Sequence, residues 1–145
     1  MTLSALIYVA ATIGLVLLLD QWSKRLVRDH VPHGHVPLGL GLRIRCVTVR
    51  RQAYGRPSSR AALIVIWCLA LAATILLALP GQGFDRGLAP WGLGAALGGA
   101  AGNLLDILRR RAVLDFIDLG WWPAFNLADV GIIAGLVVTF WPWTS

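Results

Sequence analysis

Four long apolar runs alternate with polar stretches along this chain. The runs cover about residues 3–19, 61–79, 88–108 and 125–143. Crossing a hydrocarbon core of about 30 Å takes roughly 20 helical residues, so each run is close to the length of a membrane span. In hydrocarbon such a run can satisfy its own backbone only as a helix. The pattern predicts an all-α membrane protein of four transmembrane helices, with both chain ends on one side of the membrane.

The polar region between the first two runs has a different pattern. The segment Leu42–Arg50 alternates apolar and polar residues at a period of two, which predicts an amphipathic strand. The preceding segment, Val31–Pro37, is rich in residues that break regular structure. We therefore expect a small β-cradle over about residues 31–58, lying on the membrane surface.

Composition supports membrane insertion over a soluble fold. Of the 145 residues, 57% are hydrophobic and 14% are charged, which is not a soluble composition. The first run lacks a basic start, and Asp20-Gln21 follows it in place of a small-residue cleavage site, so we expect a retained helix. Trp121 and Trp122 precede the last run and Trp143 closes it, where interfacial aromatic residues are expected.

The net charge of +6 has two readings. Clustered Lys and Arg are typical of phosphate binding in nucleic-acid proteins. In a membrane protein, the same residues lie at headgroup level and attract anionic lipid. We favour membrane lipids as partners and expect no nucleic acid. Twelve of the thirteen basic residues lie within residues 24–60 and 109–111, which the positive-inside rule would place in the cytoplasm.

Three histidines, His30, His33 and His35, raise the possibility of a metal site. Nothing in the intervening residues favours metal binding over a solvated loop. We expect no metal.

The candidate chemistry lies in the carboxylates. All seven acidic residues are Asp, and Asp106, Asp115 and Asp129 lie in or beside the last two apolar runs. Charges at membrane depth are costly and normally face a bundle interior or a water-filled cavity. Asn103 lies three residues before Asp106 on one helix face, and Asn126 has the same spacing to Asp129. We expect these five side chains to meet on one side of the membrane.

Two carboxylates in contact cannot both ionise easily, so one proton is shared between them. Such a pair can activate a water molecule as general base while donating a hydrogen bond to a scissile carbonyl. The alternative is structural, in which these Asp residues cap helices or pair with the arginines at 109–111.

Four segments resemble motifs of the lipoprotein signal peptidases, also called signal peptidase II. Residues 98–106, GGAAGNLLD, resemble the family's GGAxGNxxDR motif. Residues 113–117, VLDFI, resemble its VVDFI segment, and residues 123–129, PAFNLAD, are similar to its PxFNxAD motif. At the end of the first run, residues 20–24, DQWSK, resemble its DQxSK motif. Order, spacing and placement relative to the predicted spans agree.

The resemblance implies an aspartic endopeptidase that removes signal peptides from diacylglyceryl-modified prolipoproteins, cutting just before the lipidated cysteine. By motif position, Asp115 and Asp129 would be the catalytic pair. The residues that would support them or bind substrate are Asn103, Asp106, Asn126, Asp20 and Lys24. The resemblance implies no cofactor, a monomer sufficient for the chemistry, and a multi-pass protein of the bacterial inner membrane. Its active site would face the extracytoplasmic side, and residues 31–58 would form the family's β-cradle.

The sequence departs from the family's motifs at two places. Ile107 stands where the motif has Arg after Asp106, and an arginine at 109–111 could supply that cation. Residues 49–54 replace the family's NxGAAF segment and keep only an Ala followed by an aromatic. Two other hypotheses stay open: a non-catalytic relative that binds lipidated peptides, and a small proton-coupled transporter.

Overall fold

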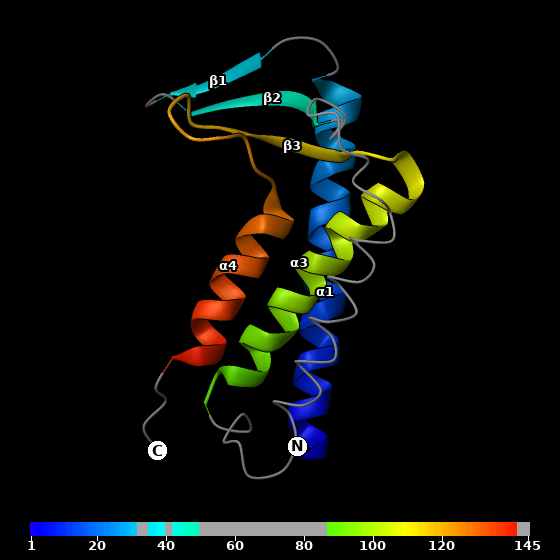
Figure 1. Cartoon of the computed structure of the whole chain (residues 1–145), viewed down its shortest axis with the longest axis vertical. Coiled ribbons are helices and arrows are strands. Elements are labelled where there is room, and N and C mark those ends of the chain that lie inside the picture. The colour runs from blue at the N-terminus through cyan, green and yellow to red at the C-terminus, as the bar shows by residue number, and fades with distance from the viewer. Residues whose placement is uncertain (32–34, 40–41, 50–86, 142–145) are drawn as a thin grey trace, which may run out of the picture.

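The computed structural model describes residues 1–31, 35–39, 42–49 and 87–141. In this part of the chain, three helices form a bundle, and a small antiparallel sheet lies across one end of it (Figure 1). The predicted span at 61–79 and the altered segment at 50–54 lie outside the described residues.

Helix α1, Leu3–His30, is longer than the apolar run that predicts it. Thr2 caps its start by accepting a hydrogen bond from the backbone N–H of Ala5 at 3.3 Å. The helix continues through the charged segment after residue 19, because Asp20 and Lys24 are satisfied by partners inside the bundle. The apolar run at 3–19 therefore covers only the first part of this helix, which extends to His30 near the sheet.

Helix α3, Ala89–Arg110, begins with Pro90 in its first turn, where a missing N–H costs nothing. It ends at Arg110, and the cap residue Arg111 adopts the left-handed conformation with φ 60°. The chain reverses there into strand β3 (Figure 1).

Glycines on α3 let α1 approach closely. Gly94, Gly98 and Gly102 lie four residues apart, and this spacing is typical of close helix packing in membranes. A Cβ atom at Gly94 would lie 2.6 Å from the carbonyl oxygen of Val9, and one at Gly102 would lie 2.5 Å from a carboxylate oxygen of Asp20. These glycines therefore serve intramolecular packing, and Gly102 makes room for a buried side chain.

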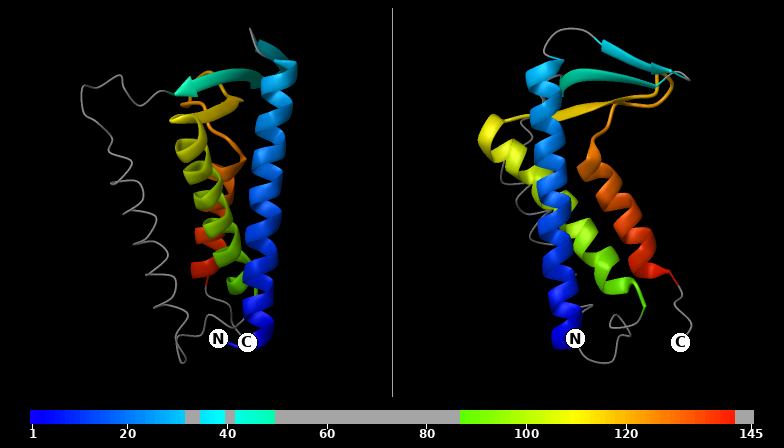
Figure 2. Two further views of the ribbon diagram at one scale, coloured as in Figure 1. Left: turned by 90° about the vertical axis from the view of Figure 1, so that its right-hand side faces the viewer. Right: turned by 180° about the vertical axis from the view of Figure 1, so that it is seen from behind.

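Helix α4, Leu127–Phe140, runs back along the bundle, opposite in direction to α1 and α3 (Figures 1 and 2). Asn126 caps its start, and a reciprocal pair of hydrogen bonds with Asp129 forms a capping box. At Gly135 an added Cβ would lie 2.5 Å from the backbone nitrogen of Ala96, so α3 and α4 also pack closely.

The sheet has strand order β1-β2-β3. Strands β1, His35–Gly39, and β2, Leu42–Val49, lie in the region predicted as a cradle. Strand β3, Val113–Asp118, pairs antiparallel with β2. The chain then turns back, and Phe125 bridges to Ile117 just before α4 begins.

The prediction of a mostly helical protein with a small sheet is confirmed, but the third strand was missed. The segment 113–118 carries two apolar pairs separated by Asp115, and this is not a period-two pattern. It becomes a strand because β2 offers it a partner, which is a long-range contact that local hydrophobicity does not report.

Among the described residues, α1 is the one helix both long and apolar enough to cross a membrane, with a mean hydropathy of 2.2 over its best window. Helix α4 is apolar but shorter. Large apolar side chains are exposed along both helices, including Leu18 and Ile133 at 70% and 66%. Such surfaces suit contact with lipid.

Candidate active site

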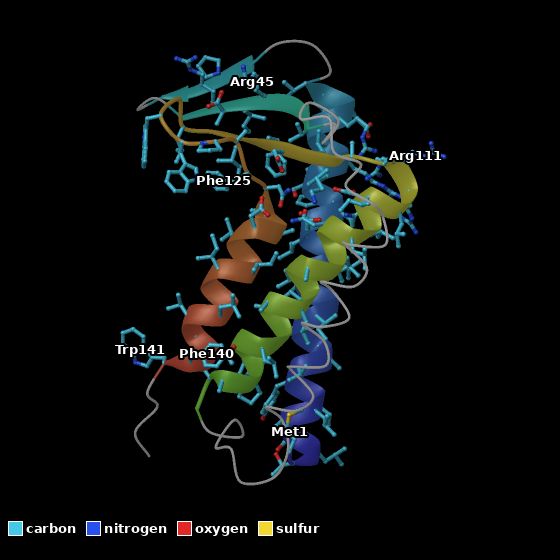
Figure 3. All side chains as sticks on the ribbon, in the orientation of Figure 1. Met1, Arg45, Arg111, Phe125, Phe140 and Trp141 are labelled. Atoms are coloured by element: carbon cyan, nitrogen blue, oxygen red, sulfur yellow. The ribbon has the colours of Figure 1, made fainter. Side chains whose placement is uncertain are left out.

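Polar side chains gather where the ends of the three helices meet the sheet (Figure 3). Lys24 of α1 lies at the centre of the group, and its side chain is fully buried. Its ammonium lies 2.8 Å from Oδ2 of Asp20, 2.8 Å from Oδ2 of Asp106 and 3.0 Å from Oδ1 of Asn103. The contacts to Asp20 and Asn103 are hydrogen bonds, whereas the contact to Asp106 is an ion pair, and Oδ2 of Asp106 accepts no hydrogen bond from the described residues.

Asp20 connects all three helices. One carboxylate oxygen binds Lys24, one turn away on α1, as their spacing predicts. The other accepts a hydrogen bond from the backbone N–H of Ala128 at 3.0 Å. That N–H lies in the first turn of α4, where backbone donors have no partner within the helix. The side chain of Asp20 therefore fixes the start of α4 against α1 while Gly102 of α3 leaves it space.

Asp106 is also fully buried and is held on both carboxylate oxygens. Oδ2 pairs with Lys24, and Oδ1 lies 2.5 Å from Nη1 of Arg110, one helical turn further along α3. The side-chain amide of Gln21 also donates to Oδ1 at 3.3 Å and to the carbonyl of Gly102 at 3.3 Å. Asp106 thus forms two ion pairs, one with Lys24 and one with Arg110.

Two asparagines link this buried group to the remaining carboxylates. Asn103 accepts from Lys24 through its oxygen and donates from its amide nitrogen to Oδ1 of Asp129 at 2.8 Å. Asn126 donates to Oδ1 of Asp115 at 2.7 Å and to Oδ1 of Asn103 at 3.2 Å. Each side-chain amide therefore has one orientation, because its oxygen accepts a hydrogen bond while its nitrogen donates one.

Asp129 and Asp115 are held from different elements but through the same residue. The backbone N–H of Asn126 donates to Oδ2 of Asp129 at 3.1 Å, while its side chain reaches Asp115 on β3. Both carboxylates are partly exposed, whereas Asn126 is fully buried. Asp115 and Asp129 are therefore two partly exposed carboxylates, both held by the buried Asn126.

An apolar cavity opens beside Asp129. Its volume is about 670 Å³, and most of its lining comes from the β3–α4 connection and from α4. Trp121, Phe125 and Ile133 contribute apolar surface, and Asp129 is the acid among the lining residues. Figure 3 shows Phe125 between the sheet and the start of α4. A largely apolar substrate could therefore reach a carboxylate.

Every residue predicted for the site lies in one hydrogen-bonded group: Asp20, Lys24, Asn103, Asp106, Asp115, Asn126 and Asp129. Sequence reasoning missed Gln21, although it is part of the DQWSK segment. The sequence did not decide which of the arginines at 109–111 replaces the cation missing at Ile107. In the structure, Arg110 pairs with Asp106. Four-residue helical spacing was the available signal for that choice.

The expectation of no metal stays a prediction. His30 forms a hydrogen bond with the carbonyl of Leu26 at 3.0 Å, and His33 lies outside the described residues. No group of three metal-binding side chains occurs within the described ranges.

Comparison with known proteins gives an independent finding. Residues 12–144 match the family described as "Signal peptidase (SPase) II". A lipoprotein signal peptidase of Moorella thermoacetica is 37% identical over 129 residues, covering 88% of this chain and 86% of the relative. The lipoprotein signal peptidase of Mycobacterium avium is 37% identical over 147 residues, covering 94% of this chain and 76% of the relative.

Two solved structures of a bacterial membrane enzyme, obtained by the in meso method, share the fold. The 1.9 Å structure has a TM-score of 0.77 at 21% identity and covers 90% of this chain and 88% of its own. The 2.3 Å structure has a TM-score of 0.74 at 21% identity, with 90% and 83% covered.

Proposed function

This chain belongs to the signal peptidase II family, and we propose that it removes signal peptides from diacylglyceryl-modified prolipoproteins, cutting just before the lipidated cysteine. Family membership makes it an aspartic peptidase. The catalytic pair is Asp115 and Asp129. The observation that carries this assignment is Asn126, which holds both carboxylates at once from a fully buried position.

In the proposed reaction, Asp129 is the ionised partner. Its two oxygens accept N–H hydrogen bonds from Asn103 and Asn126, as a carboxylate does. It takes a proton from a water molecule as the water oxygen attacks the scissile carbonyl carbon. Asp115 starts protonated. It donates its proton to the carbonyl oxygen, which stabilises the tetrahedral intermediate.

Collapse of the intermediate completes the cycle. The proton taken by Asp129 moves to the leaving nitrogen of the lipidated cysteine, and the C–N bond breaks. The proton on the former carbonyl oxygen returns to Asp115, which restores both carboxylates to their starting states. Water and peptide are the reactants, and no cofactor takes part.

The cavity beside Asp129 suits this substrate. A signal peptide and its neighbouring acyl chains are apolar, and burying apolar surface supplies about 25 cal/mol per Å². The lining residues Trp121, Phe125 and Ile133 provide such surface next to the reactive carboxylate. The cavity thus binds the apolar part of the substrate while the peptide bond lies against the Asp pair.

The finer membrane arrangement is also a proposal. We propose four membrane spans in a bacterial inner membrane protein, with the sheet and the Asp pair at the extracytoplasmic end. The exposed apolar faces of α1 and α4 support it, as do Trp121 and Trp122 at one end of α4 and Trp141 at the other. Tryptophans at both ends are typical of membrane interfaces.

The decisive experiment is cleavage of a diacylglyceryl-modified prolipoprotein by purified protein in detergent or lipid. Asp115→Asn and Asp129→Asn should each lower the rate by about 100-fold or more, because each removes a proton-transfer group. Thermal unfolding should change little in Asp115→Asn, since Asn has nearly the same shape as Asp. In Asp129→Asn the Tm should fall slightly, because one of the two N–H hydrogen bonds accepted by Asp129 is lost. Full activity in either variant would disprove the pair. Binding without cleavage by the unaltered protein would instead indicate a non-catalytic relative.

A further inference from the structure

The buried polar group lacks a balance of charge without Arg110. Asp20, Lys24 and Asp106 are all fully buried, and they amount to two anions and one cation. Uncompensated charge in a buried site is costly. The group therefore needs a second cation.

Arg110 supplies that cation from four residues after Asp106, and not from the residue directly after it. Its Nη1 lies 2.5 Å from Oδ1 of Asp106, and its side chain is 32% exposed. The residue directly after Asp106, where the family's motif has Arg, is Ile107. Arg110 reaches the carboxylate from one helical turn further on, which is a spacing at which side chains of a helix meet. It also lies in the last turn of α3, where positive charge is favourable.

From Arg110 a continuous series of contacts leads to Asp129. Asp106 binds Arg110 through Oδ1 and Lys24 through Oδ2. Lys24 also binds the oxygen of Asn103, whose amide nitrogen then points at Asp129. Without Arg110, Asp106 would have Lys24 as its one ion-pair partner in this group, and Lys24 would be drawn toward it. Asn103 would then lose the contact that orients its amide.

We propose that Arg110 is a positioning residue for the catalytic pair, acting through Asp106, Lys24 and Asn103 on Asp129. The inference rests on the proposed role of Asp129. It assigns to this chain a relocated cation in place of the one missing at Ile107.

The neighbouring arginines provide a matched control. Arg109 and Arg111 carry the same charge, are exposed, and flank Arg110 in sequence. Successive helical residues point about 100° apart, so Arg109 projects from a different face of α3. An effect of general positive charge near the site would therefore be shared by Arg109, whereas a specific pairing with Asp106 would not.

The test measures kcat and KM for prolipoprotein cleavage, together with the Tm of each variant. Arg110→Gln should lower kcat about tenfold or more with KM nearly unchanged, and Arg110→Lys should recover much of the loss. Arg109→Gln should stay within about twofold of the unaltered protein. The double variant Asp106→Asn with Arg110→Gln removes one charge of each sign, so it should be several-fold more active than Arg110→Gln alone.

Three results would overturn the proposal: equal losses in Arg109→Gln and Arg110→Gln, a change confined to KM, or a double variant no more active than Arg110→Gln alone. If Arg110→Gln does not fold, Arg110→Lys and the double variant decide the matter, because both keep the buried group close to neutral. Failure of the unaltered protein to cleave would disprove the proposed function itself, and normal cleavage without the expected pattern would disprove this inference alone.

Discussion

At the residue scale, the polar residues of the site differ in burial. Asp20, Lys24, Asp106 and Asn126 are fully buried and held by ion pairs or hydrogen bonds, while Asp115 and Asp129 are partly exposed. A buried polar network of this kind resists rearrangement, because breaking a contact leaves a polar group with neither a partner nor solvent. The two carboxylates that we propose to be catalytic, Asp115 and Asp129, are held by this network and remain accessible.

Asn126 has two separable roles, as the cap of α4 and as the bridge to Asp115. Asn126→Ser keeps an oxygen for the cap but is too short to bridge, whereas Asn126→Ala loses both. We expect both variants to lose cleavage, and Ala to cost about 1 kcal/mol more stability than Ser. Thermal unfolding and cleavage rates measure the two effects. An active Ser variant would show that the bridge to Asp115 is dispensable.

Asp20 should prove structural as well as functional. Replacing it with Ala leaves Lys24 with less charge compensation and frees the backbone N–H of Ala128. Breaking a buried ion pair costs about 3–5 kcal/mol, so we expect Asp20→Ala to lower both Tm and activity. Asp29→Ala, at an exposed position of the same helix, is the control. A stable but inactive Asp20→Ala variant would argue for a direct catalytic role.

At the element scale, α3 is built for close approach on two sides. Three of its glycines admit α1 along one edge, and Ala96 and other residues of α3 lie against Gly135 of α4 along another. Helices in a membrane associate through such packing, because lipid offers no hydrophobic drive between them. The position of the polar group follows, since Asp20 reaches α3 only where Gly102 leaves room.

Gly102→Ala tests this packing. The added Cβ would lie 2.5 Å from Oδ2 of Asp20, and overpacking of this kind typically costs about 1–3 kcal/mol. We expect lower Tm and reduced cleavage. Gly14→Ala is the matched control, because a Cβ there meets nothing within 4 Å and Ala favours the helix. Equal behaviour of the two variants in thermal unfolding would contradict the packing role.

At the scale of the whole molecule, the described carboxylate and asparagine side chains of the site lie at the sheet end of the bundle, and the residues that Figure 3 labels at the opposite end are apolar. Arg45 and Arg111 lie at the sheet end, while Met1, Phe140 and Trp141 lie at the other (Figure 3). The basic residues at the sheet end conflict with the positive-inside rule if that end is extracytoplasmic. An ordered basic surface can instead contact anionic headgroups.

Labelling of single cysteines decides the orientation. With Cys46 and Cys68 changed to Ser, Arg109→Cys marks the sheet end and Leu88→Cys marks the start of α3 at the opposite end. In right-side-out vesicles, we expect a membrane-impermeant maleimide to label position 109 and to reach position 88 only after the vesicles are opened. The reverse pattern would place the Asp pair in the cytoplasm.

Much of this protein followed from its sequence alone. Apolar runs predicted the described helices, and four motifs predicted the family, because both signals are local and depend on residue type and spacing. The tertiary structure decided the rest. It selected Arg110 among three arginines, brought Gln21 to Asp106, and made a strand of residues 113–118 by pairing them with β2. Each of these depends on a partner distant in the chain or on the face that a helix turns inward, and neither is encoded in a local pattern.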